Sequence, residues 1–196
     1  MNPPGVPVLA AAAQEIFQAL RVAEVPACLI GGLAVHRWAE PRATADVDLT
    51  VLAPYGEEAK VLDVLLGRFE ARHEGARAFA LQRRVLLLRS ANGAAVDVAL
   101  AAFPFEFQVL ERASDWEMLP GITVRTCSAE DLIIYKLVAA RPQDLADVDG
   151  VVRRQGTRLD VDRIREWGRA FAELKEDPDL LRPFEDALRK HLRPGP

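Results

Sequence analysis

The sequence predicts an α/β (α+β) protein in which helices flank a mixed β-sheet and a helical region follows at the C-terminus. Three observations support this prediction. Along residues 46–52 and 95–100, the larger apolar side chains tend to alternate with polar or small ones, a pattern typical of half-buried strands. Apolar residues recur at helical spacing before residue 23 and again after residue 128. Half of the 196 residues are hydrophobic, so the chain can bury a sizeable core.

The first part of the chain is expected to form a helix, a strand and a shorter helix. Pro7 suits the first turn of a helix, and apolar residues follow the helical period as far as Ala23. The apolar run at residues 27–30 predicts a strand that ends at Gly31. Residues 33–38 then favour a short helix, so that a glycine turn joins a strand to a helix.

The middle of the chain is expected to supply the other strands of the sheet. Pro54 and Gly56 mark a break after the strand at residues 46–52. Asn92-Gly93 is a strong hairpin signal and predicts that the segments on its two sides pair. The expected elements are a strand at 46–52, a helix at 56–69, strands at 79–89 and 95–100, and a strand at 122–126.

The last third of the chain is expected to be helical. Ser128, with the acidic Asp131 three residues later, is typical of a helix start. Further helices are expected near residues 142–155, 160–175 and 179–191. The prediction is therefore a core over residues 1–127 and a C-terminal helical region over residues 128–196 packed on that core.

Charge and composition exclude several classes of protein. The formal net charge of -4 argues against a general nucleic-acid coating protein, although a local basic groove would suffice for one RNA substrate. No apolar run approaches the roughly 20 residues that span a bilayer, and the N-terminus is rich in proline rather than basic. Cys28 and Cys127 favour reduced core thiols. We expect a cytoplasmic protein without membrane contact.

Two aspartates mark the most informative strand. Side chains alternate along a strand, so Asp46 and Asp48 point to the same face. Like charges that close repel each other unless a cation or hydrogen-bond donors lie between them. Carboxylate oxygens are ligands that Mg²⁺ and Mn²⁺ prefer, and Mg²⁺ commonly shares them with substrate phosphates. The pair therefore predicts a metal site that also binds a nucleotide.

The glycine turn and a later aspartate add to this prediction, and each has a simpler alternative. Gly31 and Gly32 allow close backbone approach to an anion at a helix start, but a plain strand-to-helix turn would also contain them. Asp97 lies in a strand-like run after the Asn92-Gly93 turn, where it could simply occupy the outward face of a half-buried strand.

Together these motifs resemble the nucleotidyltransferase superfamily with the DNA polymerase beta-like core. Residues 30–50 look like the small bacterial nucleotidyltransferases of the AbiEii toxin type and their uncharacterised relatives. Residues 128–147 are similar to the Lys, Arg and Asp-x-x-Asp helical motif that follows the core in those proteins. The resemblance covers roughly residues 25–165.

The resemblance implies an enzyme that moves a nucleoside monophosphate from a nucleoside triphosphate, such as ATP, to an acceptor hydroxyl with release of pyrophosphate. Mg²⁺ or Mn²⁺ would be held by Asp46, Asp48 and Asp97, of which Asp97 would also help to deprotonate the acceptor. By the same resemblance the catalytic residues are Asp46, Asp48, Asp97 and Lys136, and the nucleotide-binding residues are Gly31, Gly32, Thr44, Lys136 and Asp144.

The helical motif has alternatives of its own. Lys136 interrupts an apolar helix, where a surface lysine that extends its ammonium to water is as good an interpretation. Asp144 and Asp147 are also the charges that a helix N-terminus favours. The paired arginines at 83–84 and 153–154 could contact RNA phosphates, but exposure on a mixed-charge surface is the commoner explanation. Three scattered histidines do not predict a zinc site.

The acceptor is open between three hypotheses. The first is an AbiEii-like toxin of a toxin–antitoxin system, with an antitoxin partner, or a stand-alone enzyme; either would add nucleotides to RNA, in particular to tRNA 3′ ends, or to a protein side chain. The second is an antibiotic nucleotidyltransferase that modifies a small-molecule hydroxyl on an aminoglycoside or a lincosamide. The third is a non-catalytic binding partner on the same fold. Retention of Asp46, Asp48 and Asp97 together argues against the third.

Overall fold

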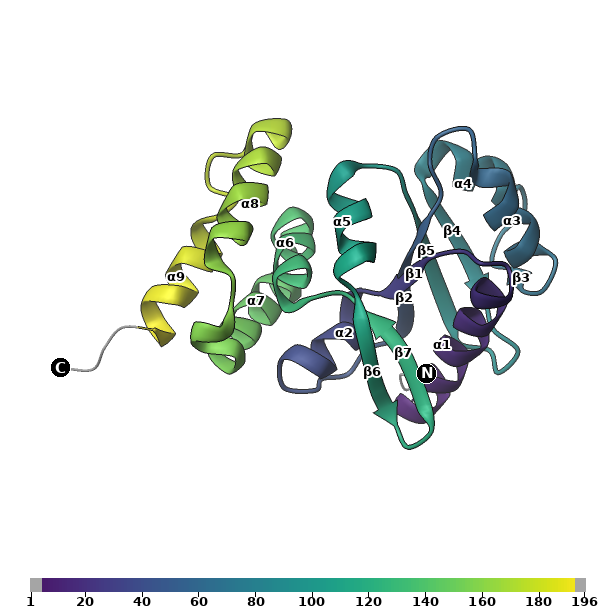
Figure 1. Cartoon of the computed structure of the whole chain (residues 1–196), viewed down its shortest axis with the longest axis horizontal. Helices are drawn as coiled ribbons and strands as arrows, with labels where there is room; N and C mark the ends of the chain where they lie inside the picture. The colour runs from purple at the N-terminus through teal and green to yellow at the C-terminus, as the bar shows by residue number, and fades with distance from the viewer. Residues whose placement is uncertain (1–4, 193–196) are drawn as a thin grey trace. The chain divides into compact units, whose positions relative to one another are not determined.

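A computed structural model describes residues 5–192 of the chain (Figure 1). Two compact units share these residues. The first consists of the chain up to residue 33 together with residues 43–127, and the second consists of residues 34–42 together with the chain from residue 128 onward. The division falls inside one short helix, after Leu33, so the segment before the Asp-bearing strand clusters with the C-terminal helices.

The first unit contains a seven-stranded mixed sheet, which confirms the predicted fold class. Its strands are β1 (Ala27–Leu29), β2 (Asp46–Leu52), β3 (Glu70–Ala71), β4 (Val85–Arg89), β5 (Ala95–Ala101), β6 (Ser114–Leu119) and β7 (Ile122–Thr126). The strand order is β3-β4-β5-β2-β1-β7-β6. The pairs β2–β5 and β1–β7 are parallel, and the other neighbouring pairs are antiparallel.

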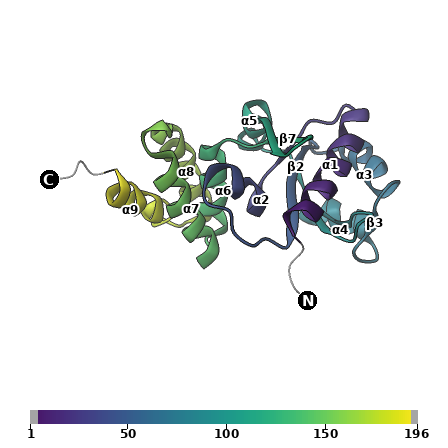
Figure 2. The same ribbon diagram turned by 90° about the horizontal axis from the view of Figure 1, so that it is seen from below.

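Two of the helices of the first unit cover one face of this sheet. The helices of the first unit are α1 (Val6–Val22), the start of α2 (Gly31–Trp38), α3 (Glu58–Leu66), α4 (Ala76–Arg83) and α5 (Pro104–Arg112). Along β2, Val47, Leu49 and Val51 are fully buried and join one core cluster with apolar side chains of α1 and α3. These two helices lie side by side (Figure 2). The polar residues that alternate with the buried ones therefore belong to the opposite face.

The structure corrects the prediction at residues 79–89. Residues 79–83 belong to helix α4, and the strand begins only at Val85. Arg84 lies between them in the left-handed region, with a φ of 58°, and ends the helix. A short apolar run does not distinguish a strand from a buried helical turn, and the Phe79-Ala-Leu-Gln-Arg83 stretch contains mostly good helix formers.

Three elements had no counterpart in the prediction. They are α5, the edge strand β6 and the two-residue strand β3. Helix α5 did carry a signal, because Pro104 occupies its first turn and the Glu106 carboxylate accepts hydrogen bonds from the backbone N–H groups of Ala102 and Phe103 at 2.7 and 3.0 Å. The final strand at residues 122–126 is confirmed and pairs with β6.

The second unit is helical, as expected for the C-terminal part of the chain. Its helices are the end of α2, α6 (Ala129–Ala139), α7 (Pro142–Gln155), α8 (Val161–Lys175) and α9 (Arg182–His191), with a 3-10 turn at Gly156–Arg158. The Ser128 hydroxyl accepts a hydrogen bond from the Asp131 N–H at 3.1 Å, which confirms the predicted cap of α6. Across residues 5–192, no helix combines the length and the apolar character needed to cross a bilayer.

Candidate functional site

Three carboxylates converge on the polar face of the sheet in the first unit. Strands β2 and β5 run parallel, and Asp48 lies directly opposite Asp97 in their register. Asp46 precedes Asp48 by two residues on the same strand and therefore shares its face. One carboxylate oxygen from each of the three residues lies within 4.8 Å of the others. The structure thus brings together the three aspartates that the sequence selected.

The glycine turn lies against the same carboxylates. Gly31 has a φ of +63°, and a Cβ atom there would come within 2.0 Å of Asp48 Oδ2. A Cβ atom at Gly32 would come within 2.3 Å of Thr44 Oγ1. The Gly32 N–H donates to Asp48 Oδ2 and the Thr44 hydroxyl donates to Asp46 Oδ1, both at 3.4 Å. Both positions therefore require glycine, since any side chain would displace a residue of the site.

The donor set fits a divalent cation. All three side chains are half-buried, and their oxygens are hard ligands of the kind that Mg²⁺ and Mn²⁺ prefer. Burial raises the pKa of the Asp97 carboxyl above its ordinary value, the Arg72 guanidinium opposes this rise, and the charge of Asp46 adds to it. A cluster in which one carboxylate is disfavoured as an anion is stabilised by added positive charge.

Arg72 is a residue of this site that the sequence did not indicate. Its Nη2 atom lies 2.5 Å from Asp97 Oδ1, and its backbone N–H donates to the Leu87 carbonyl at 3.0 Å. Leu87 lies opposite Asp97 in the β4–β5 register, so the arginine reaches across one strand on the face that carries the carboxylates. Arg72 follows the two-residue strand β3 and precedes Asp97 by 25 residues, a separation without any local pattern.

The second unit holds the remaining predicted residues in an ion-pair network whose lysine and two aspartates are buried. Lys136 is 5% exposed, and its Nζ atom lies 2.7 Å from Asp144 Oδ1 and 2.9 Å from Asp147 Oδ2. Arg42 Nε and Nη2 donate to the two carboxylate oxygens of Asp147 at 2.6 and 2.7 Å. Arg141 Nε donates to Asp144 Oδ2 at 2.6 Å. We name this set, Arg42, Lys136, Arg141, Asp144 and Asp147, the α6–α7 network.

The network lowers the pKa of both its carboxyl groups. Burial alone would raise the pKa of Asp144, but hydrogen bonds from Arg141 and Lys136 outweigh it. For Asp147, the same effect of burial is outweighed by hydrogen bonds from Arg42 and Lys136. The interpretation of Lys136 as a surface lysine is therefore wrong, whereas a role for Lys136 and Asp144 in nucleotide binding stays a prediction.

Other polar residues of the sequence have structural partners. Arg84 was expected on the surface, but its guanidinium contacts the Glu58 carboxylate and donates to the carbonyl oxygens of Ala53 and Leu100. Cys28 and Cys127 are both buried and are not joined in a disulfide, as expected. Within residues 5–192, the three aspartates of the sheet are the one group of acidic, histidine or cysteine side chains spaced to hold a metal ion.

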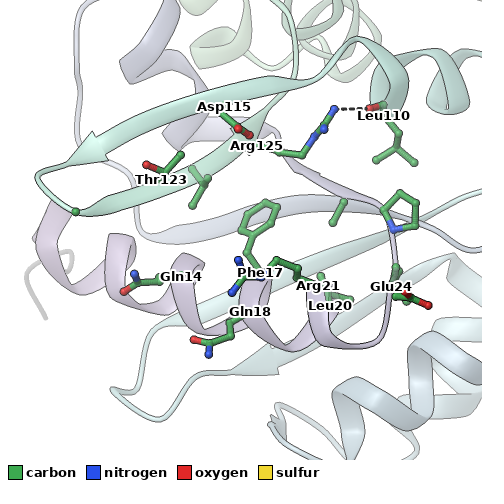
Figure 3. A pocket seen from close by; sticks show the side chains of 15 residues that line it. Gln14, Phe17, Gln18, Leu20, Arg21, Glu24, Leu110, Asp115, Thr123 and Arg125 are labelled. Carbon is green, nitrogen blue, oxygen red and sulfur yellow. Dashed lines mark hydrogen bonds between the residues drawn. The ribbon is translucent and has the colours of Figure 1, made fainter.

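The first unit also has a cavity of about 740 Å³ that lies apart from the carboxylates (Figure 3). Phe17 and Arg21 of α1 line one side, and Asp115 and Arg125 of the β6–β7 hairpin line the other. The cavity reaches Ala27 at the start of β1, whereas the glycine turn follows the end of that strand. None of the residues that the sequence selected for chemistry lines it.

Comparison with known families identifies the class of protein that this fold and this site define. Residues 8–177 match a family described as "Nucleotidyltransferase of unknown function (DUF6036)". The chain belongs to this nucleotidyltransferase family. No curated protein matches the chain.

Solved structures share the fold along most of the chain. An antigenic nucleotidyltransferase-like protein from Paracoccidioides brasiliensis aligns with a TM-score of 0.55 and 16% identity over 98% of this chain and 97% of that one. The antibiotic-resistance factor ANT(2'')-Ia aligns in its solution structure with a TM-score of 0.58 and 16% identity, over 85% and 92% of the two chains. Its crystal structure with adenylyl-2''-tobramycin aligns with a TM-score of 0.54 and 15% identity, over 85% and 98%. At these identities the likeness is one of fold, and closeness to AbiEii-type toxins stays a prediction.

Proposed function

We propose that the protein is a metal-dependent nucleotidyltransferase that moves a nucleoside monophosphate from a nucleoside triphosphate to an acceptor hydroxyl and releases pyrophosphate. The observation that carries the proposal is the convergence of Asp46, Asp48 and Asp97 beside a turn that only glycine can form. Membership of a nucleotidyltransferase family supports it. A cluster of acidic side chains on an unrelated fold would not carry the same weight.

The carboxylates divide between two tasks in this proposal. Asp46 and Asp48 hold the divalent cation, Mg²⁺ or Mn²⁺, because both extend from one strand towards one point. When bound, such ions activate the acceptor oxygen and stabilise the leaving pyrophosphate. Asp97, whose carboxylate lies beside the other two, also accepts the proton of the acceptor hydroxyl.

The glycine turn supplies the contact with the triphosphate. Helix α2 begins at Gly31, so its first backbone N–H groups and the positive end of its dipole would face a triphosphate bound at this turn. Gly32 already donates to Asp48 Oδ2 from this turn, which places its N–H group beside the cluster. Thr44 keeps its hydroxyl between Gly32 and Asp46 and orients that carboxylate.

Lys136 and Asp144 enter the proposal from the sequence motif alone. In the α6–α7 network the ammonium of Lys136 is shared by two carboxylates, so a phosphate would have to replace at least one of them. A Lys136→Gln variant separates the two roles. A raised KM for the nucleotide at unchanged kcat supports nucleotide binding, whereas a loss of stability with normal KM assigns the lysine to the network only.

The acceptor is proposed at the level of class. The resemblance to AbiEii-type nucleotidyltransferases implies RNA, in particular tRNA, or a protein side chain as the acceptor, with the enzyme acting as the toxin of a toxin–antitoxin pair. A small-molecule hydroxyl such as that of an aminoglycoside is a second candidate. One observation favours the small-molecule acceptor. The alignment with this chain covers 92–98% of the two ANT(2'')-Ia chains, and one of those structures is a complex with adenylyl-2''-tobramycin.

The test combines each nucleotide with each class of acceptor. Purified protein and Mg²⁺ are incubated with one α-labelled nucleoside triphosphate at a time, against total tRNA, an aminoglycoside mixture and no added acceptor. Label on tRNA supports the first acceptor class, label on the aminoglycosides supports the second, and label on the protein itself indicates self-modification. If no acceptor is labelled and no nucleotide binds, the proposed activity is wrong.

A further inference from the structure

The contact between Arg72 and Asp97 joins a fixed positive charge to a residue of the proposed metal site. The 2.5 Å distance between Nη2 and Oδ1 is that of a strong charge-assisted hydrogen bond. The two side chains are 25% and 30% exposed, so water still reaches the pair. A partly exposed ion pair of this kind orients the Asp97 carboxylate, but it contributes little enough free energy that another cation can displace the arginine.

The guanidinium of Arg72 is only partly satisfied where it lies. Its Nε atom is buried and has no hydrogen-bond partner among the described residues. A buried donor without an acceptor costs free energy, which weakens the arrangement relative to a fully bonded arginine. Arg84 of the same unit offers the contrast, because its Nε, Nη1 and Nη2 atoms all have acceptors. Arg84 is thus fixed by its partners in a way that Arg72 is not.

The negative charge of the three aspartates favours a divalent cation over the single positive charge of Arg72. One guanidinium carries a single positive charge and contacts a single carboxylate, whereas three carboxylate oxygens lie within 4.8 Å of one another. A divalent cation at this point carries twice the charge and contacts several oxygens at once. Two cations on one carboxylate repel each other, so Asp97 cannot favour both contacts equally.

We propose that Arg72 and a divalent cation compete for the Asp97 carboxylate, so that Arg72 sets how tightly the site binds its metal. The inference rests on the proposed function, since it concerns the same site. Asp46, Asp48 and Asp97 would hold the cation together, and Asp97 would exchange its contact with Arg72 for a contact with the cation. Arg72 is a positioning residue in this account, because it acts on the metal through Asp97.

The first experiment measures Mn²⁺ binding without any nucleotide or turnover, by electron paramagnetic resonance of the free ion and by calorimetry. Arg72→Gln removes the competing charge and is expected to bind Mn²⁺ roughly three- to fivefold more tightly than the unaltered protein. Arg77→Gln is the matched control, because Arg77 is exposed and pairs with the exposed Asp63 on the same unit. Its Mn²⁺ affinity is expected to equal that of the unaltered protein.

A double-mutant cycle separates competition from a general effect of charge. Loss of any nearby positive charge raises cation affinity slightly, whichever carboxylate the arginine contacts. If Arg72 acts through Asp97, the gain from Arg72→Gln disappears when Asp97 is already replaced by Asn. A gain of the same size in the Asp97→Asn background would overturn the inference.

The remaining outcomes distinguish failure of the competition from failure of the metal site. Unchanged or weaker Mn²⁺ binding by Arg72→Gln overturns the competition while leaving the metal site itself in place. Absence of Mn²⁺ binding in the unaltered protein and in every variant overturns the proposed function as well. Thermal unfolding verifies that each variant folds. If Arg72→Gln does not fold, Arg72→Lys replaces it in the test, because lysine pairs less well than arginine with a carboxylate. The expected gain in Mn²⁺ affinity for Arg72→Lys is about twofold.

Discussion

Replacement of Gly31 by alanine provides a sharp perturbation of the site. At a φ of +63° an alanine pays about 1–2 kcal/mol of backbone strain, which lowers the melting temperature by roughly 2–8 °C. The new Cβ atom would also lie 2.0 Å from Asp48 Oδ2, so the carboxylate must move by more than 1 Å to restore an ordinary contact. A displacement of that size at a reacting group costs about 100-fold in rate.

The matched control has the same backbone without the contact. Gly75 has a φ of +69°, and a Cβ atom there meets nothing within 4 Å. Gly75→Ala is therefore expected to lose a similar amount of thermal stability while it keeps Mn²⁺ affinity and label transfer. Thermal unfolding, Mn²⁺ titration and nucleotide labelling are measured on both variants. Full activity in Gly31→Ala would refute the reasoning, because the turn would then not constrain the site.

Three further predictions concern the carboxylates and the α6–α7 network. Asp46→Asn with Asp48→Asn is expected to abolish Mn²⁺ binding and to leave the melting temperature unchanged or higher, since it removes like-charge repulsion. Lys136→Met leaves two buried carboxylates without their shared ammonium and should cost about 3–5 kcal/mol in urea unfolding; a cost below 1 kcal/mol would contradict this. Because the pKa values of Asp144 and Asp147 are lowered in the folded chain, both carboxylates stabilise it above the ordinary aspartate pKa of about 4. This contribution to the free energy of unfolding is lost as pH falls through the lowered pKa values. Urea titrations at a series of pH values from 7 to 3 would detect the loss.

Much of the candidate site could be predicted because the information that marks it is local. Alternation along a strand placed Asp46 and Asp48 on one face without knowledge of the sheet. Asp97 was selected from its strand-like surroundings, but only the parallel register of β2 and β5 shows that it lies opposite Asp48. The glycine turn was recognised from its place between a strand and a helix, and the close approach to Asp48 explains why a side chain is excluded there.

The contacts that the sequence did not reveal depend on long-range pairing. Arg72 reaches Asp97 only because a two-residue strand pairs with β4, and strands that short have no recognisable pattern. Arg42 pairs with Asp147 across 105 residues, although the aspartate itself was visible in the helical motif. At residues 79–83 the local sequence itself was ambiguous, because a short apolar run is compatible with either a strand or a helix. The sequence prediction placed a strand there, whereas the structure has the end of helix α4.

The most direct test of the central claim is label transfer from an α-labelled nucleoside triphosphate, with pyrophosphate release, in the presence of Mg²⁺ and the acceptor that the screen identifies. The unaltered protein and an Asp115→Asn control, altered at an exposed aspartate of the same unit, are expected to transfer label equally. The Asp46→Asn, Asp48→Asn double variant is expected to fold and to transfer none. Undiminished transfer by that variant would contradict the assignment of the three carboxylates as the reaction centre.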